Sequence, residues 1–168
     1  QDLLSLNPRR LFFEKPLVAA EGQENVSEDD FVAARALLHR AAAQQCETAM
    51  IFNYRFFDQP IKAKELIAQR EFGRVVNITG LVHYACWSHA IDLLHYFADP
   101  IVELSALQSG TVRGQRMAAH DVTAAFRTGQ DATGTLIGTS MLDWTFPLLE
   151  LTFNFEKGRI HIRDLDGD

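Results

Sequence analysis

Cysteine is scarce in this chain of 168 residues. The two that occur, Cys46 and Cys86, lie far apart in the sequence and belong to no Cys-x-x-Cys pair. Two isolated cysteines indicate neither a disulfide framework nor the ligand set of a zinc ribbon. The fold is therefore expected to rest on an ordinary hydrophobic core, and free thiols are typical of a reducing compartment.

Long apolar runs and basic clusters are also missing. No stretch approaches the roughly 20 apolar residues that cross a bilayer, and the opening Gln1-Asp2-Leu3-Leu4 has neither the basic start nor the apolar core of a signal peptide. The 16 Lys and Arg are scattered and outnumbered by 22 Asp and Glu, which gives a net charge of -6. Binding to nucleic-acid phosphates requires clustered Lys and Arg. We therefore expect a cytoplasmic protein that binds neither membranes nor nucleic acids.

The first third of the chain is predicted to form a strand, a helix and a second strand. Residues 11–13 form a short strand that ends at the Glu-Lys-Pro triplet of residues 14–16, because proline has no amide hydrogen for strand pairing. Ser27, followed by three acidic residues, indicates the start of an alanine-rich helix over residues 31–45. The apolar run 48–54 is typical of a buried parallel strand. Together these elements make one βαβ unit.

The rest of the chain begins with helices and continues as successive strands. An amphipathic helix is predicted over residues 60–69, with Gly73 as its stop, and an extended segment over 75–84. Glycine, available for positive φ, indicates hairpin connections at 128–130 and 156–158. The predicted later strands cover residues 101–107, 122–127, 132–141, 148–155 and 159–162.

This order of elements predicts an α+β fold in two parts. Residues 1–55 form the βαβ unit, and residues 56–168 form a largely antiparallel open sheet with helices on one face. A βαβ unit without a sister unit leaves strand edges and apolar faces uncovered. We therefore expect the chain to be an internal piece of a longer protein.

The most informative stretch is Cys-Trp-Ser-His-Ala-Ile-Asp, residues 86–92. Ser88 is the predicted N-cap of a helix, and His89 and Asp92 would share one face of its first turn. The positive end of the helix dipole disfavours an imidazolium there, so a neutral histidine that can accept a proton is favoured. A solvated or capping histidine is the alternative, and the motif alone leaves both interpretations open.

Three motifs, taken in order, resemble the Gfo/Idh/MocA family of NAD(P)-dependent oxidoreductases. They are Glu-Lys-Pro at 14–16, Asn-Tyr-Arg-Phe at 53–56 and Ser-His-Ala-Ile-Asp at 88–92. Glu-Lys-Gly at 156–158, between late strands, is also similar to the family pattern. The resemblance covers nearly the whole chain and implies a Rossmann domain followed by an α+β domain with a large open sheet.

The resemblance also implies roles for parts of the chain. Residues 1–55 would be the C-terminal part of a dinucleotide-binding domain, and residues 56–168 a substrate and oligomerisation domain. Lys15, near the nicotinamide and the substrate, and His89, in proton transfer, would be catalytic. The residues implied in cofactor binding are Glu14, Lys15, Pro16, Asn53 and Arg55, and those implied in contacting or supporting the substrate are Tyr84 and Asp92.

Oxidation of a hydroxyl group requires residues of these types. A proton leaves the oxygen as hydride leaves the carbon, so a base is needed beside the cofactor and a cation can stabilise the developing oxyanion. The complete protein is expected to act on a sugar, a polyol or a similar small hydroxyl compound, with NAD or NADP as its cofactor. The resemblance further implies homo-oligomers that form through the sheet.

Three features depart from the family pattern. Many members place an aspartate four residues before the histidine, where this chain has Ala85, so that Tyr84 or His83 would have to substitute. Trp87 abuts Ser88, which leaves almost no loop between strand and helix. No Gly-x-Gly-x-x-Gly fingerprint occurs, because the βαβ half that cradles the pyrophosphate is absent. The isolated chain is therefore predicted to bind NAD(P) poorly or not at all.

Rival interpretations stay open. His83, Cys86 and His89 recur at three-residue intervals and are candidate ligands for zinc or copper, although no fourth ligand is evident. Cys86 as a nucleophile beside His89 lacks an orienting third group. Alternatively, the sheet could serve assembly in a non-catalytic module. The residues that would line its outer face, or else fill the core beneath the helices, are Phe126, Leu136, Leu151 and Phe153.

Overall fold

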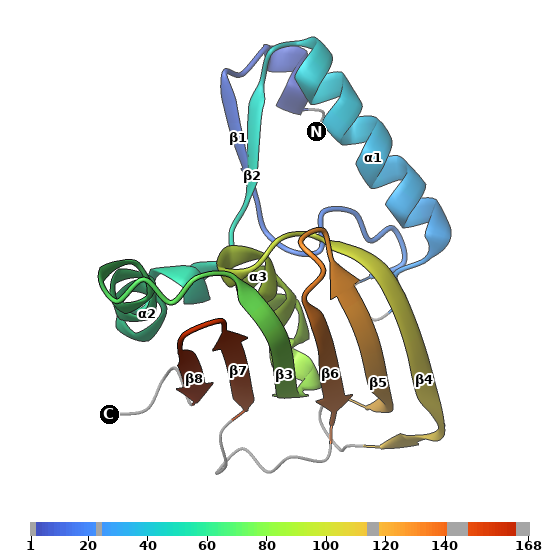
Figure 1. Cartoon of the computed structure of the whole chain (residues 1–168). Coiled ribbons are helices and arrows are strands. Elements are labelled where there is room, and N and C mark those ends of the chain that lie inside the picture. Colours follow the sequence, from blue (N-terminus) through green and yellow to red (C-terminus); the bar gives the residue numbers. More distant parts are fainter. Residues whose placement is uncertain (1–2, 23–24, 114–117, 141–147, 164–168) are drawn as a thin grey trace. The chain divides into compact units, whose positions relative to one another are not determined.

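The computed structural model of the chain describes residues 3–22, 25–113, 118–140 and 148–163 (Figure 1). By their contacts the residues divide into two compact units, Gln1–Phe52 and Asn53–Asp168, and each is described by itself. The expected boundary lies between residues 55 and 56. Residues 53–55 group with the second unit because Tyr54 and Arg55 contact side chains of that unit.

The first unit is the predicted βαβ unit. Strands β1 (Arg10–Phe13) and β2 (Glu47–Met50) pair in parallel, and helix α1 (Glu28–Ala43) connects them. Ser27 caps α1: its hydroxyl accepts a hydrogen bond from the Asp30 amide, and the Asp30 carboxylate accepts one from the Ser27 amide. The two reciprocal bonds satisfy amides that have no partner within the helix. The predicted helix start at Ser27 is confirmed.

Strand β2 is shorter than predicted. It ends at Met50, and Asn53–Phe56 form a 3-10 turn, η2, in place of the last strand residues. In a strand, Tyr54 and Arg55 would point to opposite faces. The turn instead lets both side chains contact residues of one helix in the second unit.

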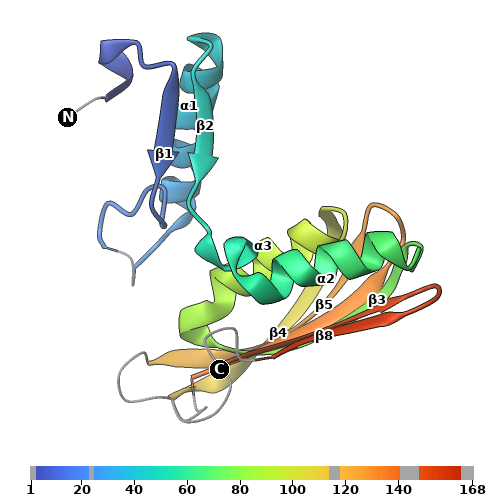
Figure 2. The ribbon, with the colours of Figure 1, turned by 90° about the vertical axis from the view of Figure 1, so that its left-hand side faces the viewer.

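The second unit contains a six-stranded sheet in the order β4-β5-β6-β3-β7-β8. Within the described residues, β3 and β6 pair in parallel, and the other neighbouring strands pair antiparallel. Helices α2 and α3 both lie on one face of this sheet (Figure 2). The α+β fold with a largely antiparallel open sheet is thereby confirmed. The bounds are α2 (Asp58–Gln69), β3 (Val75–His83), α3 (Trp87–Phe97), β4 (Ile101–Arg113), β5 (Ala119–Thr128), β6 (Thr133–Thr139), β7 (Leu149–Phe155) and β8 (Arg159–Arg163).

The strands differ from their predicted extents mainly at their ends. Strand β4 continues six residues beyond the predicted end at residue 107, to Arg113. Strand β6 ends at Thr139, and residue 141, the last of its predicted extent, lies outside the described residues. Sheet pairing sets these limits, because β4 stays paired with β5 as far as Arg113.

The core of the second unit lies between the sheet and α3. Alternate residues of β7 are buried, as are Leu93 and Leu94 on α3, so one face of the strand meets one face of the helix. Four residues considered for an apolar outer face belong to this core instead: Phe126, Leu136, Leu151 and Phe153. Of the two alternatives that the sequence left open for these residues, the core beneath the helices is therefore the one that the structure shows.

The two predicted hairpins form, but positive φ does not explain their glycines. Gly158, between β7 and β8, does not adopt a positive φ; a Cβ there would lie 2.5 Å from the Phe72 ring. Close approach of Phe72 therefore requires glycine at this position. At the β5–β6 connection the positive φ, 68°, belongs to Asp131 and not to Gly129.

Among the described residues, none of the helices combines the length and the apolar character needed to span a bilayer.

Candidate functional site

Helix α3 carries the motif that the sequence singles out, but it starts earlier than predicted. Its first residue is Trp87, and Cys86 occupies the N-cap position, so the prediction of Ser88 as N-cap is wrong. A 3-10 turn, η3 (Tyr84–Cys86), leads directly into the helix. The side chain of His83 caps that turn, because its Nδ1 accepts a hydrogen bond from the Ala85 amide at 3.1 Å. This turn connects β3 to α3, where the family resemblance implies a longer loop.

The imidazole of His89 stacks on the ring of Tyr54. The two ring centroids lie 4.0 Å apart, and the ring planes differ by 11°. Tyr54 is held in turn, since its ring stacks on Phe57 at 5.2 Å and its hydroxyl lies 3.5 Å from the Cys86 Sγ. Parallel stacking at this distance fixes the plane of the imidazole.

Asp92, one helical turn after His89, binds Arg55. The Arg55 Nε donates to Oδ2 of Asp92 at 2.9 Å, and Nη2 of the same guanidinium donates to Oδ1. The Asp92 side chain is 7% exposed and that of Arg55 34% exposed, so the pair is largely removed from water. The hydrogen bonds to Asp92 raise the pKa of Arg55 above its usual value. The Arg55 guanidinium is therefore charged at neutral pH.

Two consecutive residues of η2 thus hold two residues of α3 that are three apart. Tyr54 holds His89, and Arg55 holds Asp92. We call these four residues the η2–α3 clamp. The structure brings together Arg55, His89 and Asp92, which were all predicted as site residues, in the clamp. Through Arg55, Asp92 anchors the turn that carries Tyr54.

Sequence reasoning missed Tyr54. The residue stands between Asn53 and Arg55, and the family resemblance implies cofactor contacts for these two neighbours but none for Tyr54. One signal in the sequence is that Tyr54 directly precedes Arg55, whose guanidinium can bind a carboxylate such as that of Asp92. Nothing in the sequence indicates that His89 is the ring on which it stacks.

The other predicted site residues lie in separate places. Glu14, Lys15 and Pro16 follow β1 in the first unit, where all three are exposed and the Lys15–Pro16 peptide bond is cis. In the second unit Asn53 is exposed at the start of η2, and Tyr84 is 45% exposed in η3. The roles of these residues in cofactor and substrate binding stay predictions.

The candidate metal ligands do not form a metal site. In the part of the chain that the structure describes, no group of three His, Cys, Asp or Glu residues could hold a metal ion. The side chains of His83, Cys86 and His89 are engaged with the Ala85 amide, the Tyr54 hydroxyl and the Tyr54 ring respectively. Burial also lowers the pKa of His83, so its imidazole is neutral at neutral pH, as acceptance at Nδ1 requires.

No protein-family model and no curated protein matches the sequence. Solved structures do match the fold. WlbA dehydrogenase from Bordetella pertussis, in complex with NADH and UDP-GlcNAcA, superposes with a TM-score of 0.70 and 18% identity, over 94% of this chain and 52% of that chain. An NAD binding oxidoreductase from Klebsiella pneumoniae gives a TM-score of 0.72 and 15% identity, over 92% and 47%. Levoglucosan dehydrogenase, in complex with NADH and levoglucosan, gives 0.69 and 16%, over 92% and 48%.

These likenesses confirm the predicted resemblance at the level of the fold. The matched structures are NAD-binding oxidoreductases of the Gfo/Idh/MocA type, and the chain spans about half the length of each of them. At identities below 20%, a shared fold does not carry activity with it.

Proposed function

We propose that the chain is part of an NAD(P)-dependent oxidoreductase of the Gfo/Idh/MocA family, whose complete form acts on a sugar, a polyol or a similar hydroxyl compound. The observation that carries the proposal is the η2–α3 clamp. It joins two of the three motifs through three specific side-chain contacts and fixes the imidazole proposed for proton transfer. The shared fold supports it, since matched proteins hold NADH together with sugar-type ligands.

The clamp suits a base that must be oriented. Stacking engages the face of the His89 ring, whereas proton transfer uses the nitrogens at the ring edge. Tyr54 can therefore set the plane of the imidazole without competing for the atoms that react. In this role His89 takes the proton from the substrate hydroxyl during oxidation and returns it during reduction.

The residues at the end of β1 fit a nicotinamide cofactor. Glu14 and Lys15 are exposed directly after the carboxyl end of β1, and the Ile51 amide, just after β2, binds the Phe13 carbonyl. Open α/β sheets bind ligands at this edge. When bound, the nicotinamide would accept or supply the hydride. Lys15 would hold the substrate oxygen and stabilise the negative charge that develops on it.

Activity of the complete protein tests the proposed function. A protein that extends this chain at its N-terminus by a glycine-rich βαβ half is expected to reduce NAD or NADP in the presence of at least one compound from a panel of sugars, sugar acids and inositols. The readout is absorbance of the reduced cofactor at 340 nm. A complete protein that binds NADH but oxidises none of these would contradict the substrate class, and one that binds no dinucleotide would contradict the family.

The complete protein and the present chain are expected to differ in their affinity for the cofactor. We expect the 168 residues alone to bind NADH at least about 100-fold more weakly than the complete protein, because they contain no glycine-rich loop to hold the pyrophosphate. Fluorescence titration of NADH measures both affinities. Micromolar binding by the 168-residue chain would overturn this prediction.

We further propose that the complete protein assembles through the sheet face that the helices leave open. The strand register aligns Leu81, Ile137, Thr123 and Leu107 across four neighbouring strands on that face. The exposed fraction is 36% for Leu81, 39% for Ile137 and 79% for Leu107. An uncharged row of this kind suits a self-complementary contact. Light scattering is expected to give at least a dimer, and a monomer at micromolar concentration would contradict the proposal.

A further inference from the structure

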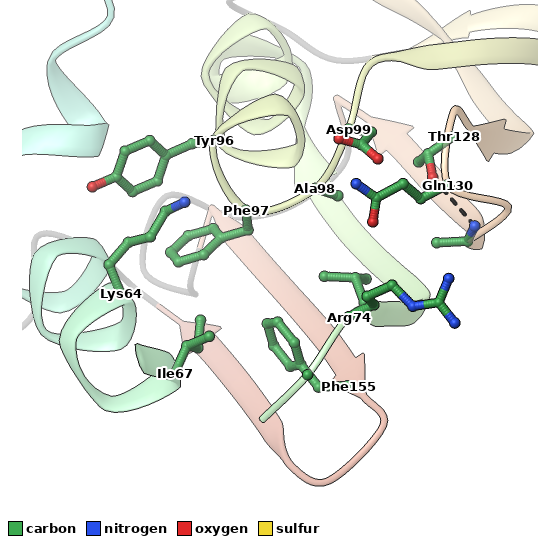
Figure 3. Close-up of a pocket in the computed structure, with 13 residues that line it drawn as sticks. Lys64, Ile67, Arg74, Tyr96, Phe97, Ala98, Asp99, Thr128, Gln130 and Phe155 are labelled. Carbon is green, nitrogen blue, oxygen red and sulfur yellow. Dashed lines mark hydrogen bonds between the residues drawn. The ribbon is translucent and has the colours of Figure 1, made fainter. Parts of the chain in front are cut away.

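A second site is indicated by a cavity of about 340 Å³ at the C-terminal end of α3 (Figure 3). All of its lining residues belong to the second unit. Ile67, Phe97 and Phe155 contribute an apolar floor, and polar side chains lie around it. The volume lies within the range of small-molecule sites, and the mixed lining offers both apolar contact and hydrogen-bonding groups.

Lys64 supplies a cation at one end of the cavity. Its ammonium lies 4.5 Å from the centroid of the Tyr96 ring and 5.5 Å from that of Phe97. Among the described residues, none of the ion pairs includes Lys64. Burial lowers its pKa, and the charge of Arg55 lowers the pKa further. A bound anion would stabilise this ammonium, which the two aromatic rings alone do not neutralise.

The opposite end of the cavity is lined by one acidic and two neutral polar side chains. Asp99, Thr128 and Gln130 lie across the apolar floor from Lys64 (Figure 3). The Thr128 hydroxyl already accepts a hydrogen bond from the Ala132 amide, whereas the Asp99 carboxylate and the Gln130 amide can pair with a ligand hydroxyl. The charge of Asp99 disfavours a second anionic group at this end.

Arg74, the second cation that lines the cavity, is already paired with an acidic side chain. The guanidinium of Arg74 donates two hydrogen bonds to the Glu156 carboxylate, at 3.1 and 3.3 Å, and its backbone amide donates a third. Lys64 is therefore the group that can select a ligand by negative charge.

We propose that this cavity binds a small hydroxylated organic carboxylate. The carboxylate lies at Lys64, the apolar body covers Ile67, Phe97 and Phe155, and the hydroxyl faces Asp99 and Gln130. The site lies at the opposite end of α3 from His89 and does not depend on the proposed oxidoreductase activity. Tyr96 links the two regions, because Arg55 of the η2–α3 clamp lies 5.3 Å from the same ring.

A pair of probes that differ in charge tests this site on the chain as it stands. 4-Hydroxyphenylacetate carries the carboxylate, the ring and the hydroxyl, whereas tyramine keeps the ring and the hydroxyl and carries an ammonium. In an NMR titration of the ¹⁵N-labelled chain, 4-hydroxyphenylacetate is expected to shift the amide signals of Tyr96–Asp99 and Gln130 with a Kd of about 1 mM or below. Tyramine is expected to bind at least about 10-fold more weakly.

Two matched lysine variants test whether Lys64 causes the preference for an anionic ligand. Lys64→Met keeps the methylene contacts with the aromatic rings and is expected to weaken binding of 4-hydroxyphenylacetate about 10-fold. Lys62→Met, on the same helix but paired with Glu65 outside the cavity, should leave it unchanged. Equal binding of the two probes, unchanged affinity in Lys64→Met, or no saturable shift would overturn the proposal. The probe comparison needs no variant, so a misfolded Lys64→Met leaves the test intact.

Discussion

Replacing Asp92 by alanine is expected to lower the free energy of unfolding by about 3 kcal/mol. Asp92 is buried, and the change leaves the Arg55 guanidinium without the two hydrogen bonds that compensate for its removal from water. Loss of one partner of a buried pair costs more than the pair itself contributes, because a charge remains unpaired. Arg55 retains 34% exposure, which keeps the expected loss below the upper end of the range for fully buried pairs. Urea denaturation followed by circular dichroism measures the loss.

A surface pair of the same chemistry is the matched control. The Glu103 Oε2 accepts hydrogen bonds from both Nε and Nη2 of Arg127, whereas Arg55 donates to both carboxylate oxygens of Asp92. The Glu103 side chain is 64% exposed. Glu103→Ala is expected to cost less than about 1 kcal/mol, since water replaces the lost contacts. Similar losses of unfolding free energy in Asp92→Ala and Glu103→Ala would show that burial does not make the Asp92–Arg55 pair more stabilising than an exposed pair.

Replacing His89 by glutamine is expected to lower the kcat of the complete protein by about 10²- to 10⁴-fold, as loss of a general base does. Glutamine cannot take up the proton at neutral pH, whereas its size keeps the start of α3 filled. The KM for the cofactor should change little, because the residues predicted to bind the cofactor, at positions 14–16, 53 and 55, do not include His89. Steady-state kinetics with thermal unfolding as a folding control measures the effect. A variant that retains most of the wild-type kcat would remove His89 from the mechanism.

A pair of Tyr54 variants tests the orienting role separately. Tyr54→Leu removes the stacked ring and is expected to lower kcat about 10-fold or more with little change in KM, because the imidazole loses its fixed plane. Tyr54→Phe keeps the stacked ring and loses the hydroxyl that contacts Cys86, so it should retain most of the activity. Equal loss in both variants would assign the effect to the hydroxyl and not to stacking.

The elements that the sequence predicted correctly depend on neighbours along the chain. Ser27 with Asp30 indicates the start of α1, because both members of the capping box lie within one helical turn. Alternation in β7 and helical spacing in α3 group the apolar side chains on one face of each element, because both patterns repeat within a few residues. The open antiparallel sheet follows from the succession of such strands and turns.

The errors concern contacts between distant segments. Ser88 has the side chain of an N-cap, yet η3, over Tyr84–Cys86, turns the chain before Ser88 is reached and the helix begins at Trp87. Gly158 has the freedom that a hairpin uses, yet what requires it is the ring of Phe72, far away in the sequence. A local pattern contains no information on which distant residue fills the space beside it.

In the candidate site, too, features of short segments can be predicted from the sequence, whereas contacts between distant residues cannot. The motifs, their order and the types of side chain that suit proton transfer can be predicted from the amino-acid sequence, since they are properties of short segments. That Tyr54 stacks on His89 and that Arg55 neutralises Asp92 could not, because 35 residues or more separate the partners of each contact, Arg55 and Asp92 being 37 residues apart. These contacts exist because η2 packs directly against α3 in the folded unit, and close packing then determines which side chain lies beside each ring and each charge.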